Sequence, residues 1–466
     1  MHSIIASRSR TEWILKNNGL YRETDTKIKW NNFIPKCAAG TQHQRYYLTC
    51  GAQDLLLAMF NEEFSPRKTS YSPGTVHQCF LRIQTLSRWM SKHGIWGFNK
   101  LSAEDVIEFL KSRRARSSGP INERTLDAWI YLFKTMWKLR SMYRGSIRID
   151  VTSIEDEIKR SVAQSRRTPW KGFSEATAMG IVKDALHWME TYGDFLITTT
   201  QRSWVDFDKH VGITSRQRAI MRQRFYRQLE TEPLLGDLRR DLGEPSLATH
   251  KVLSKAVTTI EGAAISLILI LVGLRVSELA SLNVDCVTEQ RVDGDIIPFI
   301  NGIAAKKGGL PRHWVASEPV PTAINLLVAF NEKIRAVSKT DALFVNRPAG
   351  SPISLPARRV SRCTSDQLAN RMKAFVTAPF REDRPSKCHP HMARKTFAKL
   401  VVKRDRRGLE PVAHHLGHVF QWFTDGAYVG FDHELMECPR RSKSEPLCRS
   451  SIEPGLVADQ RVVSCG

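Results

Sequence analysis

The sequence predicts a mainly α-helical, multidomain protein with one small antiparallel β-sheet in its carboxyl-terminal half. The chain has 466 residues, of which 42% are hydrophobic, enough to build two or three ordinary cores. Apolar residues recur at helical spacing from 72 to about 150 and again from about 256 to about 425. Strand-like patterns occur at 296–303 and 312–320. Helices therefore dominate, and a hairpin interrupts the second helical stretch.

The first part of the chain divides into an irregular segment and a helical one. Residues 1–67 mix aromatic, basic and turn-forming residues without steady periodicity, which predicts an amino-terminal arm or small subdomain. Ser72 can then cap a helix whose first position suits Pro73. This helix should bury one apolar face, made of Val76, Phe80, Ile83, Leu86 and Met90.

Two further helices complete the predicted helical module. Ser102 and Asp105 have the spacing of a capping box, so they should begin a helix that covers Val106 to Arg114. A Ser/Gly/Pro linker at 117–120 precedes a third helix, with Leu126, Ile130, Phe133 and Trp137 on its apolar face.

The middle of the chain is strongly basic. A helix is expected from Ser174 to Tyr192. An arginine-dense segment follows, with Arg216, Arg218, Arg222, Arg224 and Arg227 spread around a helix rather than along one face. A solvated helix and a phosphate-following surface both explain this spacing, and the two interpretations stay open.

An apolar helix and a hairpin follow. The helix is expected from about 256 to Leu274, and its most apolar stretch, 262–274, is thirteen residues long, too short to span a bilayer. A short helix restarts at Ser277, and two strands, 296–303 and 312–320, enclose a turn with Lys306 and Lys307. No membrane association is expected.

The charge balance points to a polyanionic partner. Lys and Arg total 70 against 47 Asp and Glu, a formal net charge of +23. Nucleic acid is the leading candidate, although excess charge can also serve only solubility. The nine cysteines are scattered and never form a CxxC pair, which predicts free thiols in a reducing, cytoplasmic compartment.

A first candidate for chemistry lies at the end of the apolar helix. Arg275 leaves a buried helix, where a cation needs an anionic partner, and Glu278 is three positions further on. The carboxylate of Glu278 can hold the guanidinium in one orientation. An Arg–Glu ion pair that only stabilises the fold would have the same local sequence.

A second candidate group lies further along the chain. His391 and Arg394 form an HxxR pattern, and His418 follows in the sequence LGH. Tyr428 lies ten residues after His418 and is the only tyrosine after Tyr226. Together these residues suggest a nucleophile with an attached phosphate-binding site.

These blocks, in this order, resemble the tyrosine recombinases of the phage-integrase superfamily. The sequence GLRVSEL at 273–279 looks like the first arginine box of the family, 391–398 resembles its HxxR box, and 416–418 resembles its third block. Tyr428 falls where the family keeps its nucleophile. The motifs cover about 256–430, and the helical region 68–150 is similar in size to the core-binding domain of the family.

The resemblance implies a division of the chain into four parts. These are an arm or subdomain at 1–67, a helical core-binding domain at 68–165, a catalytic domain at 166–430 with an insertion around 193–250, and a tail at 431–466. The core-binding and catalytic domains would form a C-shaped clamp around double-stranded DNA. The boundary between 150 and 250 stays open.

The resemblance also implies roles for the site residues. Tyr428 would attack a phosphodiester, Arg275 and Arg394 would bind the phosphate, and Glu278 would support Arg275. By the same resemblance, His391 would assist proton transfer and His418 would donate a hydrogen bond to the phosphate. A hairpin lysine, Lys307 or alternatively Lys306, would protonate the leaving 5'-hydroxyl.

Partners and cofactors follow from the same resemblance. The reaction would need neither metal nor ATP, and no cofactor is expected. Strand exchange implies a homotetramer on two DNA duplexes, and accessory DNA-bending proteins are a further expected partner class. The biological role would be integration or excision of a mobile element.

The sequence departs from the family pattern at several positions, and other functions would also explain some of the same residues. Ala393 and Lys395 differ from the residues usual in the HxxR box, and the interval from His418 to Tyr428 is one residue longer than in a common type of the family. A metal site is one rival, with candidate ligands Cys388, His389, His391, His414 and His418. The others are a DNA-binding factor without catalysis and a type IB topoisomerase.

Overall fold

The computed structural model describes most of the chain. Its described residues are 5–8, 11–15, 26–36, 38–60, 73–113, 119–165, 170–208, 214–292, 294–304, 310–347, 360–404 and 409–416.

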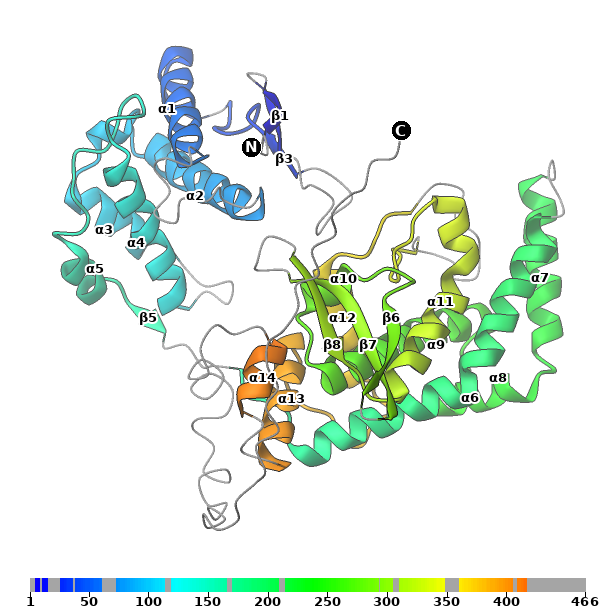
Figure 1. The fold of residues 1–466 in the computed structure, drawn as a ribbon. Coiled ribbons are helices and arrows are strands. Elements are labelled where there is room, and N and C mark those ends of the chain that lie inside the picture. Colours follow the sequence, from blue (N-terminus) through cyan, green and yellow to red (C-terminus); the bar gives the residue numbers. More distant parts are fainter. Residues whose placement is uncertain are drawn as a thin grey trace, which may run out of the picture.

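The described residues form two lobes, each with its own hydrophobic core (Figure 1). The core of the amino-terminal lobe, residues 5–165, runs from Trp13 to Val162. The main core of the carboxyl-terminal lobe, residues 170–416, runs from Phe173 to Ala393. The chain is mainly helical, as predicted.

The amino-terminal lobe combines helices with short strands. Its elements are β1 (Ile5–Arg8), β2 (Glu12–Leu15), β3 (Thr26–Lys29), α1 (Gln42–Phe60), α2 (Pro73–Lys92), the 3-10 helix η2 (Phe98–Lys100), α3 (Ala103–Lys111), β4 (Ile121–Asn122), α4 (Glu123–Lys138), α5 (Glu155–Ser161) and β5 (Gln164–Ser165).

Local signals predict three helices of this lobe, α2, α3 and α4, although α3 runs from Ala103 to Lys111 and not from Val106 to Arg114 as expected. Pro73 begins α2, whose expected apolar face is buried, while Ser72 lies outside the described residues. Ser102 and Asp105 form the predicted capping box: the Asp105 backbone N–H donates to Ser102 Oγ at 3.1 Å, and the Ser102 N–H donates to Asp105 Oδ2 at 2.8 Å. The face of α4 that contains Leu126 is also buried.

The sequence patterns do not predict the elements before α2. An antiparallel sheet of order β1-β2-β3 and the helix α1 occupy this region. The Trp13 and Trp30 rings lie edge to face at 4.9 Å between centroids, and Trp30 contacts Phe80 of α2 at 5.1 Å. This part of the chain therefore shares one core with the helices that follow.

The carboxyl-terminal lobe is built from longer helices and one sheet. Its elements are α6 (Glu175–Asp208), α7 (Ser215–Leu229), α8 (Pro233–Asp241), α9 (Thr249–Val272), α10 (Val276–Ala280), β6 (Val287–Val292), β7 (Asp295–Ala304), β8 (Leu310–Val315), α11 (Pro319–Ser338), α12 (Ser365–Val376), α13 (Pro390–Arg404) and α14 (Leu409–Leu416).

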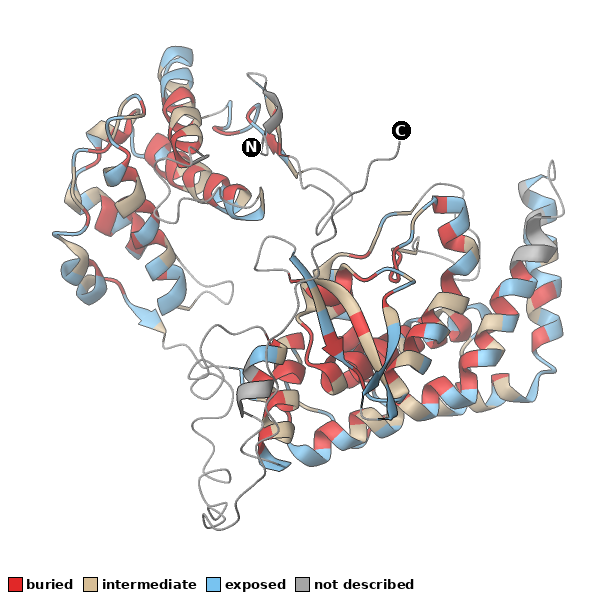
Figure 2. Cartoon of the chain, viewed as in Figure 1, coloured by how far each residue is buried: buried red, intermediate tan, exposed pale blue. Residues whose placement is uncertain are grey.

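Helix α9 is the centre of this lobe and packs against α6, α11, α12 and α13. It starts earlier than predicted, at Thr249. Among the described residues it is the one helix long and apolar enough to cross a membrane, but 78% of its most apolar stretch is buried (Figure 2). Its apolar surface is therefore covered by the other helices of the lobe.

Helices α6 and α7 extend the lobe away from α13 and α14 (Figure 1). The predicted helix ending at Tyr192 is too short, because α6 continues to Asp208. The arginine-dense segment is indeed helical, and Phe225 and Leu229 of α7 are buried, whereas Arg224 and Arg227 are exposed.

The sheet of this lobe has the order β6-β7-β8 and is antiparallel throughout. Ile300 pairs with Trp314, and Ala304 pairs with Leu310 at the hairpin end. The prediction that the second strand reaches Val320 is wrong, since β8 ends at Val315 and Pro319 begins α11. Proline has no backbone N–H and suits the first turn of a helix better than a strand.

Candidate active site

The first part of the site is the turn between α9 and α10. Gly273 ends α9 in the left-handed region at φ 71°, where glycine carries no steric cost. This turn places Arg275 at the start of α10, with its side chain directed to Glu278. Glu278 Oε1 accepts a 2.6 Å hydrogen bond from Arg275 Nη1, and Oε2 accepts one of 2.8 Å from the Arg275 backbone N–H. The predicted contact between Glu278 and the Arg275 guanidinium is present in the structure.

Helix α13 brings a second arginine to the same turn. Arg394 is almost fully buried, with 1% of its side chain exposed, and its Nη1 donates to the Gly273 carbonyl oxygen at 2.6 Å. Arg394 Nη1 also lies 3.7 Å from Oε2 of Glu278, whose side chain is fully buried. Glu278 therefore links the two arginines that the sequence analysis selected.

The arginines also converge on the end of α14. The Leu416 carbonyl oxygen accepts hydrogen bonds from Arg394 Nη2 at 2.5 Å and from Arg275 Nη2 at 3.5 Å. We call the carbonyl groups of His414, His415 and Leu416 the α14 carbonyl end. The site residues thus come from the start of α10 and from α13 and α14, which lie much later in the sequence.

A third arginine, not selected from the sequence, reaches the α14 carbonyl end from β8. Arg312 Nη2 donates to the carbonyl oxygens of His414 at 2.5 Å and His415 at 2.7 Å. Burial lowers the pKa of Arg312, while the nearby Glu278 carboxylate raises it. The alternation of side chains along a strand could have selected Arg312 from the sequence, because Arg312 lies on the same face of β8 as the buried Trp314.

The electrostatic balance of this region favours an anion. One buried carboxylate, Glu278, faces the guanidinium groups of Arg275, Arg394 and Arg312. Arginine stays charged in proteins and presents a planar fork that matches phosphate oxygens. The arrangement can therefore hold a phosphate group next to α10.

The histidines of the region differ in their surroundings. His391 lies in the first turn of α13, half-buried, and its backbone N–H donates to Nδ1 of His389 at 3.1 Å. The ring of His415 stacks on Phe397, and its Nε2 lies 2.8 Å from the Val272 carbonyl oxygen. Burial lowers the pKa of His415 to about 4, so this ring is neutral at pH 7 and Nε2 donates to that carbonyl.

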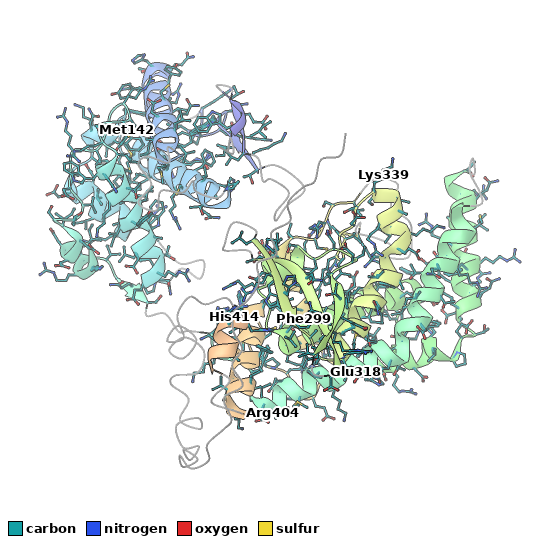
Figure 3. The ribbon with its side chains drawn as sticks, viewed as in Figure 1. Met142, Phe299, Glu318, Lys339, Arg404 and His414 are labelled. Carbon is teal, nitrogen blue, oxygen red and sulfur yellow. The ribbon has the colours of Figure 1, made fainter. Side chains whose placement is uncertain are left out.

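A groove adjoins the site between the sheet and the last two helices. Its volume is about 940 Å³, and its lining includes Phe299, Arg312, Phe397, Val412 and His414. Figure 3 labels Phe299 on β7 and His414 on α14. The groove therefore borders the α14 carbonyl end.

Three of the predicted site residues lie outside the described residues. These are Lys307, His418 and Tyr428, and the alternative lysine, Lys306, lies outside as well. In the described chain, β7 ends at Ala304 and β8 begins at Leu310, on either side of the two lysines, and α14 ends at Leu416, two positions before His418.

The predicted rival metal site finds little geometric support in the described region. Within the described residues, no group of three His, Cys, Asp or Glu side chains is placed to hold a metal ion. Burial raises the pKa of the Cys388 thiol to about 11, which disfavours the thiolate that a metal needs. His389 stacks on Trp170, with ring centroids 4.9 Å apart.

Comparisons with known proteins identify one family. Residues 248–430 match the model of the phage integrase family. Among curated proteins, none matches the chain.

Several solved structures are similar to the chain. The XerA recombinase is 14% identical, with 83% of this chain and 99% of that chain covered and a TM-score of 0.31. The XerH site-specific recombinase bound to difH substrate is 13% identical, with 87% and 90% covered and a TM-score of 0.43. A lambda integrase dimer bound to a COC' core site is 10% identical, with 95% and 99% covered and a TM-score of 0.36.

The matched region contains α9 to α14 and every site residue selected from the sequence. It includes the turn where Arg275 and Arg394 meet around Glu278. Residues 248–430 therefore form a phage integrase domain, the catalytic domain of the tyrosine recombinases, which are enzymes that break and rejoin DNA strands.

Proposed function

We propose that the protein is a site-specific DNA recombinase that integrates or excises a mobile element through a 3'-phosphotyrosyl intermediate. The observation that carries this proposal is the meeting of Arg275 and Arg394 around the buried Glu278. Two arginines from distant parts of the chain have one carboxylate between them. The remaining positive charge suits the phosphate of a DNA backbone.

In the proposed reaction, the Tyr428 hydroxyl oxygen attacks the scissile phosphorus. The bond from phosphorus to the 5'-oxygen breaks, and Lys307, or alternatively Lys306, gives a proton to that oxygen. His391 assists removal of the phenol proton. The 3'-phosphotyrosyl bond replaces one phosphodiester by another, so a 5'-hydroxyl can later reverse the step without ATP or a metal ion.

Two arginines and one histidine would stabilise the transition state. Arg275 and Arg394 would bind the non-bridging oxygens, where negative charge increases as the phosphorane forms. Glu278 would hold Arg275 in place, and His418 would donate a further hydrogen bond. Preorganised donors are effective here because they need no reorientation during the reaction.

The proposed partner is double-stranded DNA. The net charge of +23 favours binding to phosphates, and such binding weakens as salt rises. We propose that residues 68–165 act as the core-binding domain and close a clamp with the catalytic domain, and that a homotetramer exchanges strands between two duplexes. Accessory DNA-bending proteins are further proposed partners.

A nicked suicide substrate tests the proposal. Repeats in the DNA that flanks the gene supply the candidate site, and a denaturing gel detects the covalent adduct. Wild-type protein should form the adduct and Tyr428→Phe should not. Tyr226→Phe is a matched control, because this half-buried tyrosine lies on α7, and it should form the adduct normally.

The outcomes separate the rival functions. An adduct that persists in Tyr428→Phe contradicts the proposed nucleophile. Specific binding without any adduct would favour a non-catalytic DNA-binding factor. Relaxation of supercoiled DNA without strand exchange would favour a type IB topoisomerase.

A further inference from the structure

The carboxyl end of α14 is held by side chains from other elements. Helix α14 has only eight residues, and so short a helix has little stability of its own in water. Its buried residues Val412 and Leu416 form a small cluster with Ala398 and Val402 of α13. The position of its last turn therefore depends strongly on the contacts made by its carbonyl groups.

The last carbonyl groups of a helix lack partners within the helix and carry partial negative charge. Arg312 satisfies two of them with one nitrogen, as it donates to the carbonyl oxygens of both His414 and His415. Its own position is fixed by the sheet, where its guanidinium lies 5.3 Å from the ring centroid of the buried Trp314. Arg312 thus fastens α14 to β8.

The three arginines at the α14 carbonyl end contact different carbonyl groups. Arg275 and Arg394 contact the Leu416 carbonyl, and they are also the proposed phosphate ligands. Arg312 contacts the other two carbonyl groups and not that of Leu416. Arg312 can therefore hold the helix end while the other two guanidinium groups donate to a phosphate.

We propose that Arg312 is a positioning residue that fixes the end of α14 relative to the Arg275–Arg394 pair. The chain continues from Leu416 to His418 in two residues, so the end of α14 determines where the segment with His418 and Tyr428 starts. Misplacement of reacting groups by about 1 Å can cost about a hundredfold in rate. The inference rests on the proposed function.

The first test measures the reaction itself. Arg312→Gln removes the charge, and Arg312→Lys keeps it without the planar fork. We expect Arg312→Gln to form the phosphotyrosyl adduct about 10- to 100-fold more slowly at saturating nicked DNA, with the Kd for DNA changed less than threefold. Arg312→Lys should restore part of the rate, and it also serves if the glutamine variant folds poorly.

A matched control separates positioning from general stability. Arg335 of α11 is a buried arginine that donates to the carbonyl oxygens of Leu327 and Val328, and burial lowers its pKa, as it does for Arg312. Arg335→Gln should lower the melting temperature but keep the wild-type rate at a temperature where the variant is folded. Equal slowing of both variants would overturn the inference.

A second measurement does not depend on catalysis. Hydrogen exchange should be faster in peptides that cover 409–416 in Arg312→Gln, and unchanged there in Arg335→Gln. Unchanged exchange refutes the anchoring of α14 even if the enzyme is inactive. Failure of the adduct test with Tyr428, by contrast, would refute the proposed function and leave the hydrogen-exchange result unaffected.

Two other outcomes also contradict the inference. A wild-type rate in Arg312→Gln at saturating DNA would mean that the contact has no influence on the reaction. A weaker Kd with an unchanged saturated rate would mean that Arg312 binds DNA directly instead of positioning α14.

Discussion

Replacing Glu278 by glutamine tests the centre of the site. The glutamine side chain has the same shape but no charge, and it offers one acceptor oxygen where the carboxylate offers two. In the structure, one carboxylate oxygen accepts from Arg275 Nη1 and the other from the Arg275 backbone N–H. One of these donors would therefore face an NH2 group.

The size of the effect follows from burial. Arg394 has 1% of its side chain exposed and would lose the carboxylate 3.7 Å away, whereas Arg275 has 19% exposed and retains some access to water. Removing one partner of a buried ion pair costs about 3–5 kcal/mol. Arg394 keeps its hydrogen bonds to the Gly273 and Leu416 carbonyl oxygens, so we expect the loss of unfolding free energy to lie at the lower end of this range, at about 3 kcal/mol. This loss corresponds to a decrease of roughly 6–12 °C in Tm.

The assay compares Glu278→Gln with Glu261→Gln. Glu261 is also a buried carboxylate between two arginines, with Arg347 at 3.4 Å and Arg371 at 3.1 Å, and it lies in the middle of α9. Calorimetry should show similar losses of stability in the two variants. Adduct formation below both melting temperatures should be slowed about a hundredfold only in Glu278→Gln, because only this variant loosens Arg275.

Two results would refute this reasoning. A change in unfolding free energy of less than about 1 kcal/mol for Glu278→Gln would show that loss of the carboxylate leaves no uncompensated buried charge. Equal rates in the two variants would show that Glu278 supports the fold and not the reaction.

Three further predictions can be tested directly. Gly273→Ala should destabilise the protein by roughly 2–4 kcal/mol in urea unfolding, since a Cβ at this positive φ would lie 2.5 Å from Phe397 Cδ1, and normal stability would refute the contact. The His415 pKa is about 4 in the folded protein against about 6.5 when unfolded, so stability is lost as pH falls through this window. Urea unfolding should show a loss of about 2 kcal/mol between pH 7 and pH 5 that His415→Gln removes. Adding EDTA should leave adduct formation unchanged, and a strong decrease would revive the metal-site interpretation.

Local signals in the sequence predicted local structure well. The Ser102–Asp105 capping box and the pairing of Arg275 with Glu278 each depend on residues three positions apart, and both are present in the structure. The end of β8 was missed although the signal was available, because Pro319 marks a helix start. Sequence reasoning is therefore most reliable where partners are close along the chain.

Contacts that depend on tertiary structure were not predictable in the same way. The core around Trp13 and Trp30 forms from aromatic side chains in short strands and turns that show no steady period. The partners of Arg312 are backbone carbonyl groups, which have no signature in the sequence. Only the folded chain shows that β8 and α14 meet.

The burial of α9 has a consequence for synthesis of the protein. Its apolar surface is covered in part by α12, whose last residue, Val376, follows Val272 by 104 residues. At about 5–20 residues per second, a ribosome needs roughly 5–20 s to add that length. During this interval the nascent chain exposes the part of the apolar surface of α9 that α12 later covers. Chaperones should therefore bind the chain there, and chains truncated before α12 should aggregate.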